Sequence, residues 1–364
     1  MERNNKGNII FSRKNIKMKF IVLLLNLVNL IINQKRKKYK KVGIIGLPHS
    51  QNIGNNLLKY AMYIKISEFG FDPYIIGRRI GNKNISFILR TVKAILINKS
   101  FTEINRNDYD ILMVNSDQTW RRNCDKFFYD IAFLNFSKNW DIPKFVYGAS
   151  LGNDFWEYSI KEEAIIKSLL KNFNGISIRE KGSIKLIEDH LKLKPTFVLD
   201  PTFLINKKYY LNLIKNFKID NLIENSFIFI YTVTNSTELN NFIKNISEKY
   251  NYKCYLIGIN TINQIQKFIY GINKCKAVIT DSYHGTIFSI IFNKPFISFV
   301  YEKRGKERFN SLKEIFNLQN RIVNYNSYPD INLLEEPLNI DMKYLYSLKK
   351  KSIHFLKSNL LISK

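Results

Sequence analysis

A histidine, two hydroxyl side chains and a carboxylate lie within five consecutive residues, Asp281-Ser-Tyr-His-Gly285. Histidine is the residue type best suited to accept and donate a proton during a reaction near neutral pH, so His284 is the candidate for this role. The carboxylate of Asp281 can orient that imidazole or fix the turn, and both interpretations stay open. The stretch also precedes a helical pattern, and the free N–H groups at a helix start favour an anion. The predicted catalytic residues are His284 and Asp281, and the residues predicted to bind an anionic donor are Ser282, Gly285 and Thr286.

A second polar stretch, Asn115-Ser-Asp-Gln-Thr-Trp120, follows the apolar run Asp110–Val114. Carboxylate and amide side chains pair with sugar hydroxyls, and an indole can stack on the face of a sugar ring. A structural role is the alternative for Trp120. Two asparagines of an earlier loop can donate hydrogen bonds to the same substrate. The predicted acceptor-binding residues are Asn52, Asn55, Ser116, Asp117, Gln118 and Trp120.

An arginine stands at the end of another apolar run. Arg179 follows Gly175–Ile178 and precedes a helical segment. A guanidinium group at a strand end can make a bidentate contact with a phosphate or a carboxylate. We therefore predict that Arg179 binds an anionic donor group, and a salt bridge to Glu180 or Asp200 is the alternative.

Short apolar runs alternate with helical patterns along most of the chain, which is typical of parallel α/β domains. Six runs before residue 202 predict one complete sheet, and the runs from residue 226 onward predict a second. Residues 78–100 are basic and partly helical in pattern, so we predict a solvent-exposed segment there. In such sheets ligands bind at the carboxyl ends of the strands, where the polar stretches lie. The six predicted strands are residues 42–47, 73–76, 110–114, 144–150, 175–178 and 196–199.

The 364 residues carry 57 Lys or Arg and 30 Asp or Glu, a formal net charge of +27. Such a surface suits anionic partners, although joint enrichment in Lys, Asn and Ile also fits a genome base-composition effect without a specific partner. Nothing resembles a nucleic-acid-binding module, so no nucleic-acid partner is expected. Cys124, Cys254 and Cys275 form neither a metal motif nor a disulfide framework, so we expect no metal and a reducing compartment.

Residues 1–42 contain 12 Lys or Arg and one Glu, a net charge of +11. The apolar segment Phe20–Ile32 is shorter than the roughly 20 residues that a spanning helix needs. One helical face collects the polar positions Lys19, Asn26, Asn29 and Asn33. This pattern predicts a helix in the membrane interface with a polybasic flank for anionic lipid. A helix packed on the domain and an artefactual extension from a mis-assigned start are the alternatives. We expect a cytoplasmic protein, peripheral on the cytoplasmic face of the membrane if the first interpretation holds.

Four stretches, found in the expected order between residues 41 and 325, resemble motifs of the polysaccharide pyruvyl transferase family. Asp281–Thr286 with Phe288–Pro295 resembles the C-terminal signature of that family. In the loop that contains Asn52-Ile-Gly-Asn55, we expect Gly54 to serve the turn. The other three stretches are Asn52-Ile-Gly-Asn55, Asn115-Ser-Asp-Gln-Thr-Trp120, and Ile176–Lys181 with Val198-Leu-Asp-Pro-Thr202.

The resemblance implies two Rossmann-like domains similar to the GT-B glycosyltransferases. It implies transfer of a pyruvyl group from phosphoenolpyruvate, as co-substrate, to a sugar of a cell-surface polysaccharide or its precursor. No further cofactor is implied, and the expected acceptor is an oligosaccharide or a lipid-linked sugar. The family often has an arginine near Arg308 that reaches the cleft, so Arg308 and Arg179 are expected to bind the anionic groups of the donor.

The resemblance also implies how the chain is divided. A basic, amphipathic extension covers residues 1–40. An N-terminal Rossmann-like domain on the acceptor side covers residues 41–205, and a polar linker covers residues 206–224. A C-terminal Rossmann-like domain on the donor side covers residues 225–330. A helical tail within residues 331–364 is expected to pack back across both domains.

The chain departs from the family pattern at one informative place. Many members have Arg-Leu-His-Gly where this chain has Ser282-Tyr-His-Gly285. That arginine would suit the phosphate or carboxylate of phosphoenolpyruvate, so another cation must compensate for it. A GT-B glycosyltransferase would show a nucleobase slot and a ribose-binding carboxylate. A non-catalytic relative at the membrane surface would fail to bring Arg179, Arg308 and His284 to one cavity.

Overall fold

The chain separates into two units, Met1–Lys40 and Lys41–Lys364. In the first unit, β1 (Glu2–Arg3) pairs antiparallel with β2 (Ile9–Ile10). The interfacial helix expected over Phe20–Ile32 lies outside the described residues. The computed structural model describes residues 2–3, 9–10, 39–48, 52–78, 87–97, 100–122, 127–217, 227–234, 236–258 and 261–362.

The first sheet of the larger unit has seven described parallel strands in the order β5-β4-β3-β6-β7-β8-β9. The order reverses between β3 and β6, which creates a crevice at the carboxyl ends of these two strands. The strands are β3 (Lys41–Ile45), β4 (Asp72–Arg78), β5 (Ala94–Ile97), β6 (Ile111–Val114), β7 (Lys144–Ala149), β8 (Gly175–Ile178) and β9 (Thr196–Phe197). The helices between them are α2 (Ile53–Glu68), α3 (Phe87–Thr91), α4 (Phe128–Phe133), α5 (Ile160–Leu170) and α6 (Gly182–Leu191).

The prediction of six strands before residue 202 is wrong, because residues 78–100 contribute the edge strand β5. This strand pairs with β4 on one side only, and Ile95 in its middle is exposed. An edge strand needs no long apolar run, because one of its sides does not pack against another strand. The apolar run Ala94–Ile97 is therefore too short, in a basic segment, to predict a strand from the sequence.

The second sheet has five described parallel strands in the order β11-β10-β12-β13-β14, with its own reversal between β10 and β12. The strands are β10 (Phe227–Tyr231), β11 (Lys253–Ile257), β12 (Ala277–Thr280), β13 (Phe296–Val300) and β14 (Ile322–Asn324). The helices are α8 (Thr237–Tyr250), α9 (Gln264–Lys274), α10 (Tyr283–Ile291) and α11 (Glu307–Phe316), and α7 (Lys207–Asn212) precedes this sheet. The two sheets together confirm the predicted α/β class with two Rossmann-like sheets.

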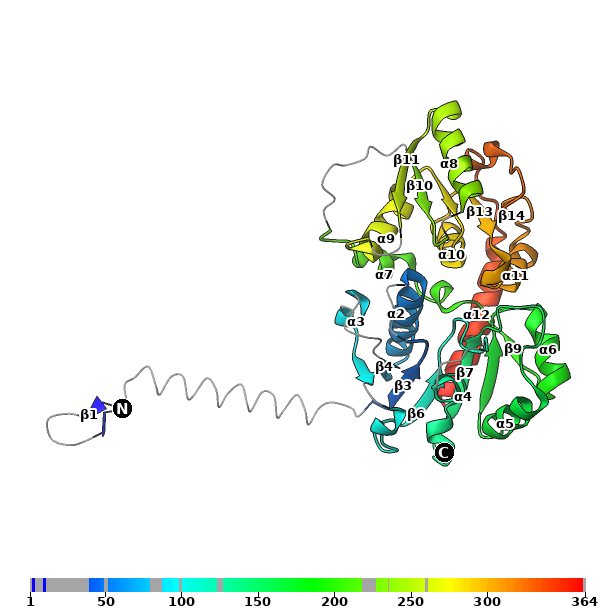
Figure 1. The fold of residues 1–364 in the computed structure, drawn as a ribbon. Coiled ribbons are helices and arrows are strands. Elements are labelled where there is room, and N and C mark those ends of the chain that lie inside the picture. Colours follow the sequence, from blue (N-terminus) through cyan, green and yellow to red (C-terminus); the bar gives the residue numbers. More distant parts are fainter. Residues whose placement is uncertain are drawn as a thin grey trace. The chain divides into compact units, whose positions relative to one another are not determined.

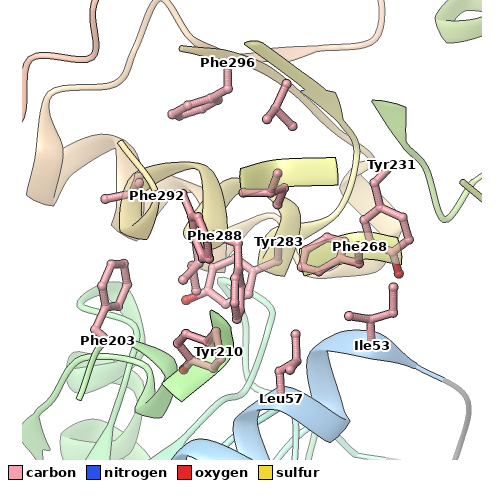
Figure 2. Packing of buried hydrophobic residues seen from close by; sticks show 14 of the residues in the cluster. Ile53, Leu57, Phe203, Tyr210, Tyr231, Phe268, Tyr283, Phe288, Phe292 and Phe296 are labelled. Atoms are coloured by element: carbon pink, nitrogen blue, oxygen red, sulfur yellow. The ribbon is translucent and has the colours of Figure 1, made fainter. Parts of the chain in front are cut away.

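A shared apolar cluster joins the two sheets. Ile53 and Leu57 of α2 belong to the same buried cluster as Phe268 of α9 and Phe288 of α10. Figure 2 shows the two α2 side chains pointing toward these rings, with Tyr210 of α7 beside them. Since every one of these side chains is withdrawn from water, the burial favours this arrangement of α2 and α10. The amino ends of both helices consequently meet at the same place.

The tail of the chain packs back across both sheets, as predicted. The short 3-10 helix η5 (Ile331–Leu334) places Leu334 in the core behind the second sheet. The last helix, α12 (Met342–Leu360), then runs to the first sheet, where Leu356 and Leu360 enter its core (Figure 1). The Leu199 N–H also donates to the Ser352 hydroxyl of α12. Within the part of the chain that the structure describes, no helix is long and apolar enough to cross a membrane.

Candidate active site

A cavity of about 350 Å³ lies where the carboxyl ends of both sheets face each other. It receives side chains from the loops after β3 and β6 of the first sheet and after β10, β12 and β13 of the second. The lining from the first sheet is Leu47, Pro48, Asn52, Asn55, Asp117, Gln118 and Arg121. The lining from the second is Val233, Asp281, Ser282, Tyr283, His284, Tyr301, Arg304, Arg308 and Phe309. Both predicted groups, catalytic and acceptor-binding, are therefore represented in one cavity.

Two helix amino ends contribute to this cavity. Asn52 caps α2, since its Oδ1 accepts the Asn55 N–H at 3.0 Å. Ser282 caps α10, since its Oγ accepts the Gly285 N–H at 3.3 Å. Helix amino ends carry partial positive charge, and three arginines line the same cavity. The combined field favours an anion.

The His284 imidazole lies directly against the backbone of Gly54. A Cβ atom at residue 54 would be 2.0 Å from His284 Nδ1 and 2.5 Å from its Cγ. A side chain at this position would therefore displace the imidazole. The expectation that Gly54 serves a turn is wrong, because this residue lies within α2. Its lack of a side chain gives His284 room across the boundary between the two sheets.

The carboxylate beside His284 belongs to Asp200 and not to Asp281. Asp200 Oδ2 lies 3.6 Å from His284 Nε2, beyond a direct hydrogen bond but within ion-pair distance. Burial alone would raise the pKa of Asp200, but the interaction with His284 and the charge of Arg179 outweigh burial and hold that pKa well below its usual range. Asp200 is therefore a carboxylate at neutral pH and stabilises a positive charge on the imidazole. In the sequence, the family-like stretch Leu199-Asp-Pro-Thr202 was the feature that could have identified Asp200 as a site residue.

Asp281 fixes the loop after β10. Its Oδ1 accepts the Val233 N–H at 2.6 Å, and its Oδ2 accepts the Thr234 N–H at 2.8 Å and the Tyr325 hydroxyl at 2.9 Å. Both carboxylate oxygens are thus occupied by neighbours other than His284. Of the two roles left open by the sequence, the structure supports the one in which Asp281 holds the turn.

Arg179 is buried below the cavity and does not line it. Its guanidinium group lies between Asp200 and Asp117, with Nη2 at 3.1 Å from Asp117 Oδ1. The structure therefore shows the salt-bridge alternative for Arg179, which also contacts the face of Tyr283 at 4.8 Å. Burial raises the pKa of Asp117, but the charges of Arg179, His284 and Arg308 lower it below its ordinary value.

Arg308 lies on the Tyr283 ring as well, 5.0 Å from the ring centre, but it lines the cavity. Its guanidinium donates to the carbonyl oxygens of Gly305 and Arg304. Among the described residues, no carboxylate lies within ion-pair distance of it. Burial, reinforced by the charge of Arg179, lowers the pKa of Arg308 to about 10, so it remains a cation at neutral pH.

Two further arginines of the cavity were missed by sequence reasoning. Arg304, at the end of the 3-10 helix Glu302–Arg304, donates to the Thr234 hydroxyl at 3.2 Å. Arg121 follows the polar stretch that ends at Trp120. Both stand in charged or polar segments, where a solvated side chain is the ordinary interpretation.

Four predicted site residues are structural and lie outside the cavity lining. The Ser116 hydroxyl donates to the Gly148 carbonyl, and the buried Trp120 indole N–H donates to the Ala132 carbonyl at 2.9 Å. The Thr286 hydroxyl donates to the Ser282 carbonyl at 3.1 Å. A Cβ atom at Gly285 would be 2.3 Å from Thr280 Oγ1, so this glycine allows α10 to pack closely on β12. The structure therefore places Ser116, Trp120, Gly285 and Thr286 beside the cavity lining rather than in it.

The sequence profile of the polysaccharide pyruvyl transferase family matches residues 52–303, well over half of the chain. The chain belongs to the polysaccharide pyruvyl transferase family. The matched range contains the site residues His284, Asp200, Asp117 and Gln118, whereas Arg304 and Arg308 follow it directly. No curated protein matches the chain in sequence.

Solved structures of other enzymes are similar to the chain at low sequence identity. The UDP-GlcNAc 2-epimerase from Methanocaldococcus jannaschii is 14% identical, with a TM-score of 0.53 over 83% of this chain and 93% of the epimerase chain. The S. aureus MnaA-UDP co-structure is 12% identical, with a TM-score of 0.47 over 87% and 91% of the two chains. Arabidopsis thaliana UGT89C1 complexed with quercetin is 9% identical, with a TM-score of 0.48 over 89% and 100%. The likeness to the M. jannaschii enzyme supports the two-sheet fold and carries no information on the reaction.

The cavity has arginines although the arginine common in the family is absent from this chain. Ser282, which stands where many members have arginine, caps α10. Arg304 and Arg308 enter the same cavity from the segment after β13. Among the described residues, no three His, Cys, Asp or Glu side chains form a group that could hold a metal ion. That no metal or other cofactor is needed stays a prediction.

Proposed function

We propose that the protein transfers a pyruvyl group from phosphoenolpyruvate to two hydroxyls of one sugar, forming a pyruvate ketal. The sugar belongs to a cell-surface polysaccharide or to its free or lipid-linked precursor. The observation that carries the proposal is the meeting of His284, Arg304 and Arg308 in one cavity at two helix amino ends. Membership of the polysaccharide pyruvyl transferase family supports the same class of reaction.

The cationic part of the cavity is suited to the donor. Phosphoenolpyruvate carries a phosphate and a carboxylate, and guanidinium groups bind both through charge-assisted hydrogen bonds. Among the described residues, the Arg308 guanidinium donates hydrogen bonds to carbonyl oxygens, and that of Arg304 donates to one hydroxyl. The helix amino ends stabilise negative charge that remains on the departing phosphate.

The reaction requires two steps. In the first, one sugar hydroxyl adds to C2 of phosphoenolpyruvate, C3 gains a proton and the hydroxyl loses one. In the second, the C2–O bond to phosphate breaks, the second hydroxyl bonds to C2, and its proton leaves. The imidazole of His284 moves protons in these steps, and the ionised Asp200 stabilises its charged form. Inorganic phosphate and the cyclic ketal are the products.

The first-sheet side of the cavity is suited to the acceptor. Asp117 and Gln118 lie on one loop, and Asn55 lies at the start of α2. Gln118 Nε2 is buried without a hydrogen-bond partner among the described residues, so a bound hydroxyl oxygen would satisfy it. Asp117 has an unusual backbone, with φ of 93°, and such strain is often found at functional sites. These residues would orient the hydroxyl pair toward C2.

The test is phosphate release from phosphoenolpyruvate with a panel of free and lipid-linked oligosaccharides. We expect acceptor-dependent release by the wild type and by His354→Ala, which changes an exposed histidine of α12. We expect no detectable release by His284→Ala. Failure of every acceptor to promote release, together with sugar transfer from a nucleotide sugar, would replace this proposal by a glycosyltransferase function.

A further inference from the structure

A second, more open cavity of about 680 Å³ adjoins the candidate active site. The two cavities share Tyr301, and Thr234 of the second follows Val233 of the first in the chain, so a ligand can extend from one into the other. The second cavity lies at the carboxyl ends of β13 and β14 and beside the start of α8. Its lining is Thr234, Ser236, Thr237, Glu238, Val300, Tyr301, Glu302, Asn324, Tyr325, Asn326 and Ser327.

The two cavities differ in their charged lining. The first has Arg121, Arg304 and Arg308 together with Asp117 and Asp281, whereas the charged side chains among the described lining of the second are Glu238 and Glu302. An anionic ligand such as a phosphate or a nucleotide would be repelled by these carboxylates. Hydroxyl and amide groups supply the rest of the polar lining. This chemistry favours a neutral ligand with many hydroxyls.

An aromatic wall stands at the junction of the cavities. Tyr301 is 37% exposed and meets Tyr325 edge to face, with ring centres 5.9 Å apart and planes at 85°. The Tyr325 hydroxyl donates to Asp281, which ties this ring to the loop that borders the first cavity. Exposed aromatic rings beside amides and carboxylates are the usual composition of a sugar-binding surface, because ring faces stack and polar groups pair with hydroxyls.

We propose that this second cavity is a subsite for the further sugars of an uncharged oligosaccharide acceptor. The inference rests on the proposed function, in which the reacting sugar occupies the first cavity. Sugars beyond the reacting one would pass Tyr301 and lie against Asn324, Asn326 and Ser327. The acceptor would then be an oligosaccharide at least a few residues long, and recognition would depend on its length.

The experiment uses a pair of matched variants of the full chain. Ser327→Trp places an indole in the second cavity, whereas Tyr328→Trp places one at the next residue, whose side chain is fully exposed and does not line the cavity. The probes are methyl glycosides of glucose, galactose, mannose and N-acetylglucosamine and the trisaccharides built from each of these sugars. Dissociation constants are measured by ligand-observed NMR.

We expect at least one trisaccharide to bind more tightly than its monosaccharide in the wild type and in Tyr328→Trp. In Ser327→Trp this advantage should fall by about tenfold, the effect of losing one or two polar contacts, with the monosaccharide unchanged. Absence of any length effect in the wild type would overturn the subsite, as would equal loss in both variants. UDP binding that is weakened by Ser327→Trp alone would overturn it in favour of a nucleotide.

Phosphate release from phosphoenolpyruvate separates this inference from the proposed function. Release on a monosaccharide without any length effect would refute the subsite and leave the transfer reaction standing. A length effect on binding that Ser327→Trp removes, without phosphate release on any probe, would support the subsite and count against the donor.

Discussion

Two arginines lie on the ring of Tyr283, and their surroundings differ. Arg179, from the end of β8 in the first sheet, is held by the buried carboxylates of Asp117 and Asp200. Arg308, from α11 of the second sheet, is also buried but donates to two carbonyl oxygens and lines the cavity. The residue type and the aromatic neighbour are the same, so the difference comes from the other groups that surround each guanidinium, above all the two carboxylates beside Arg179.

The comparison shows which of the two arginines can attract an anionic ligand. Asp117 and Asp200 neutralise the positive charge of Arg179. The Arg179 guanidinium therefore holds these two carboxylates in place and contributes little electrostatic attraction to a bound anion. Arg308 has no such partner among the described residues, and its lowered pKa reflects burial together with repulsion from Arg179. A group that is unfavourable in the empty site becomes favourable when an anion binds. The predictions below test this distinction.

Removing the compensated arginine should have the largest effect, and on stability. Arg179→Met would leave Asp117 and Asp200 buried without their cation, which costs about 3–5 kcal/mol. Urea denaturation of the variant would measure the change in the free energy of unfolding. Arg106→Met, at an exposed arginine that donates to the Asp141 carbonyl, serves as the control and should change little. An Arg179→Met protein of normal stability would break the comparison.

Removing the available arginine should instead affect binding. Arg308→Met is expected to lower kcat/KM for phosphoenolpyruvate by about 10²–10³-fold, because a cation is lost from a water-poor site. The free protein should be as stable as the wild type or more so, since the repulsion with Arg179 disappears. Lys306→Met, which removes a surface cation paired with Asp154, controls for charge. Equal destabilisation by Arg308→Met and Arg179→Met would show that the two arginines do not differ.

Lys59 of α2 extends the comparison to a third buried cation. Burial lowers the pKa of Lys59 to about 7, although the charge of Asp117 partly opposes this, and its Nζ donates to the Leu47 carbonyl at 2.8 Å. Because the folded pKa lies below the ordinary value, the unfolded chain binds the extra proton between pH 7 and about 10. The free energy of unfolding should therefore rise by about 2 kcal/mol from pH 7 to pH 9 through this group.

Lys59→Met removes the titrating group, so the pH profiles of wild type and variant should differ in slope. Unfolding free energies at several pH values between 6 and 9 would measure the slopes. Parallel profiles would mean that Lys59 keeps an ordinary pKa and that burial has been compensated. The variant retains a side chain of similar length, which limits effects of packing.

The smallest effect is expected at Trp120. Trp120→Phe removes the indole N–H that donates to the Ala132 carbonyl, at a cost of about 1–2 kcal/mol in the free energy of unfolding. The KM for the acceptor should not change, because the ring lies in the core of the first sheet. Thermal denaturation and acceptor kinetics measure the two quantities. A large rise in acceptor KM would restore the stacking role that the sequence suggested.

Local sequence signals were sufficient for much of the fold. Apolar runs with a period of 3.6 gave α10 and α12, and the buried strands β10, β12 and β13 gave continuous apolar runs. The edge strand β5 was not found, because partial exposure weakens such a run. Asn52 was found from its motif, but Gly54 was assigned to a turn, because a close approach from another part of the chain has no local signal.

The sequence by itself determined the alternation of strands and helices, the family, and the positions of His284, Asp117, Gln118 and Arg308, because these depend on periodicity and short motifs. Only the tertiary structure decided which charges compensate one another. Asp200 lies beside His284 and binds Arg179, although the three residues come from three separate segments. Ion pairs depend on distances of a few ångströms between segments remote in the sequence, and such distances are fixed only when both sheets and the apolar cluster between them are in place.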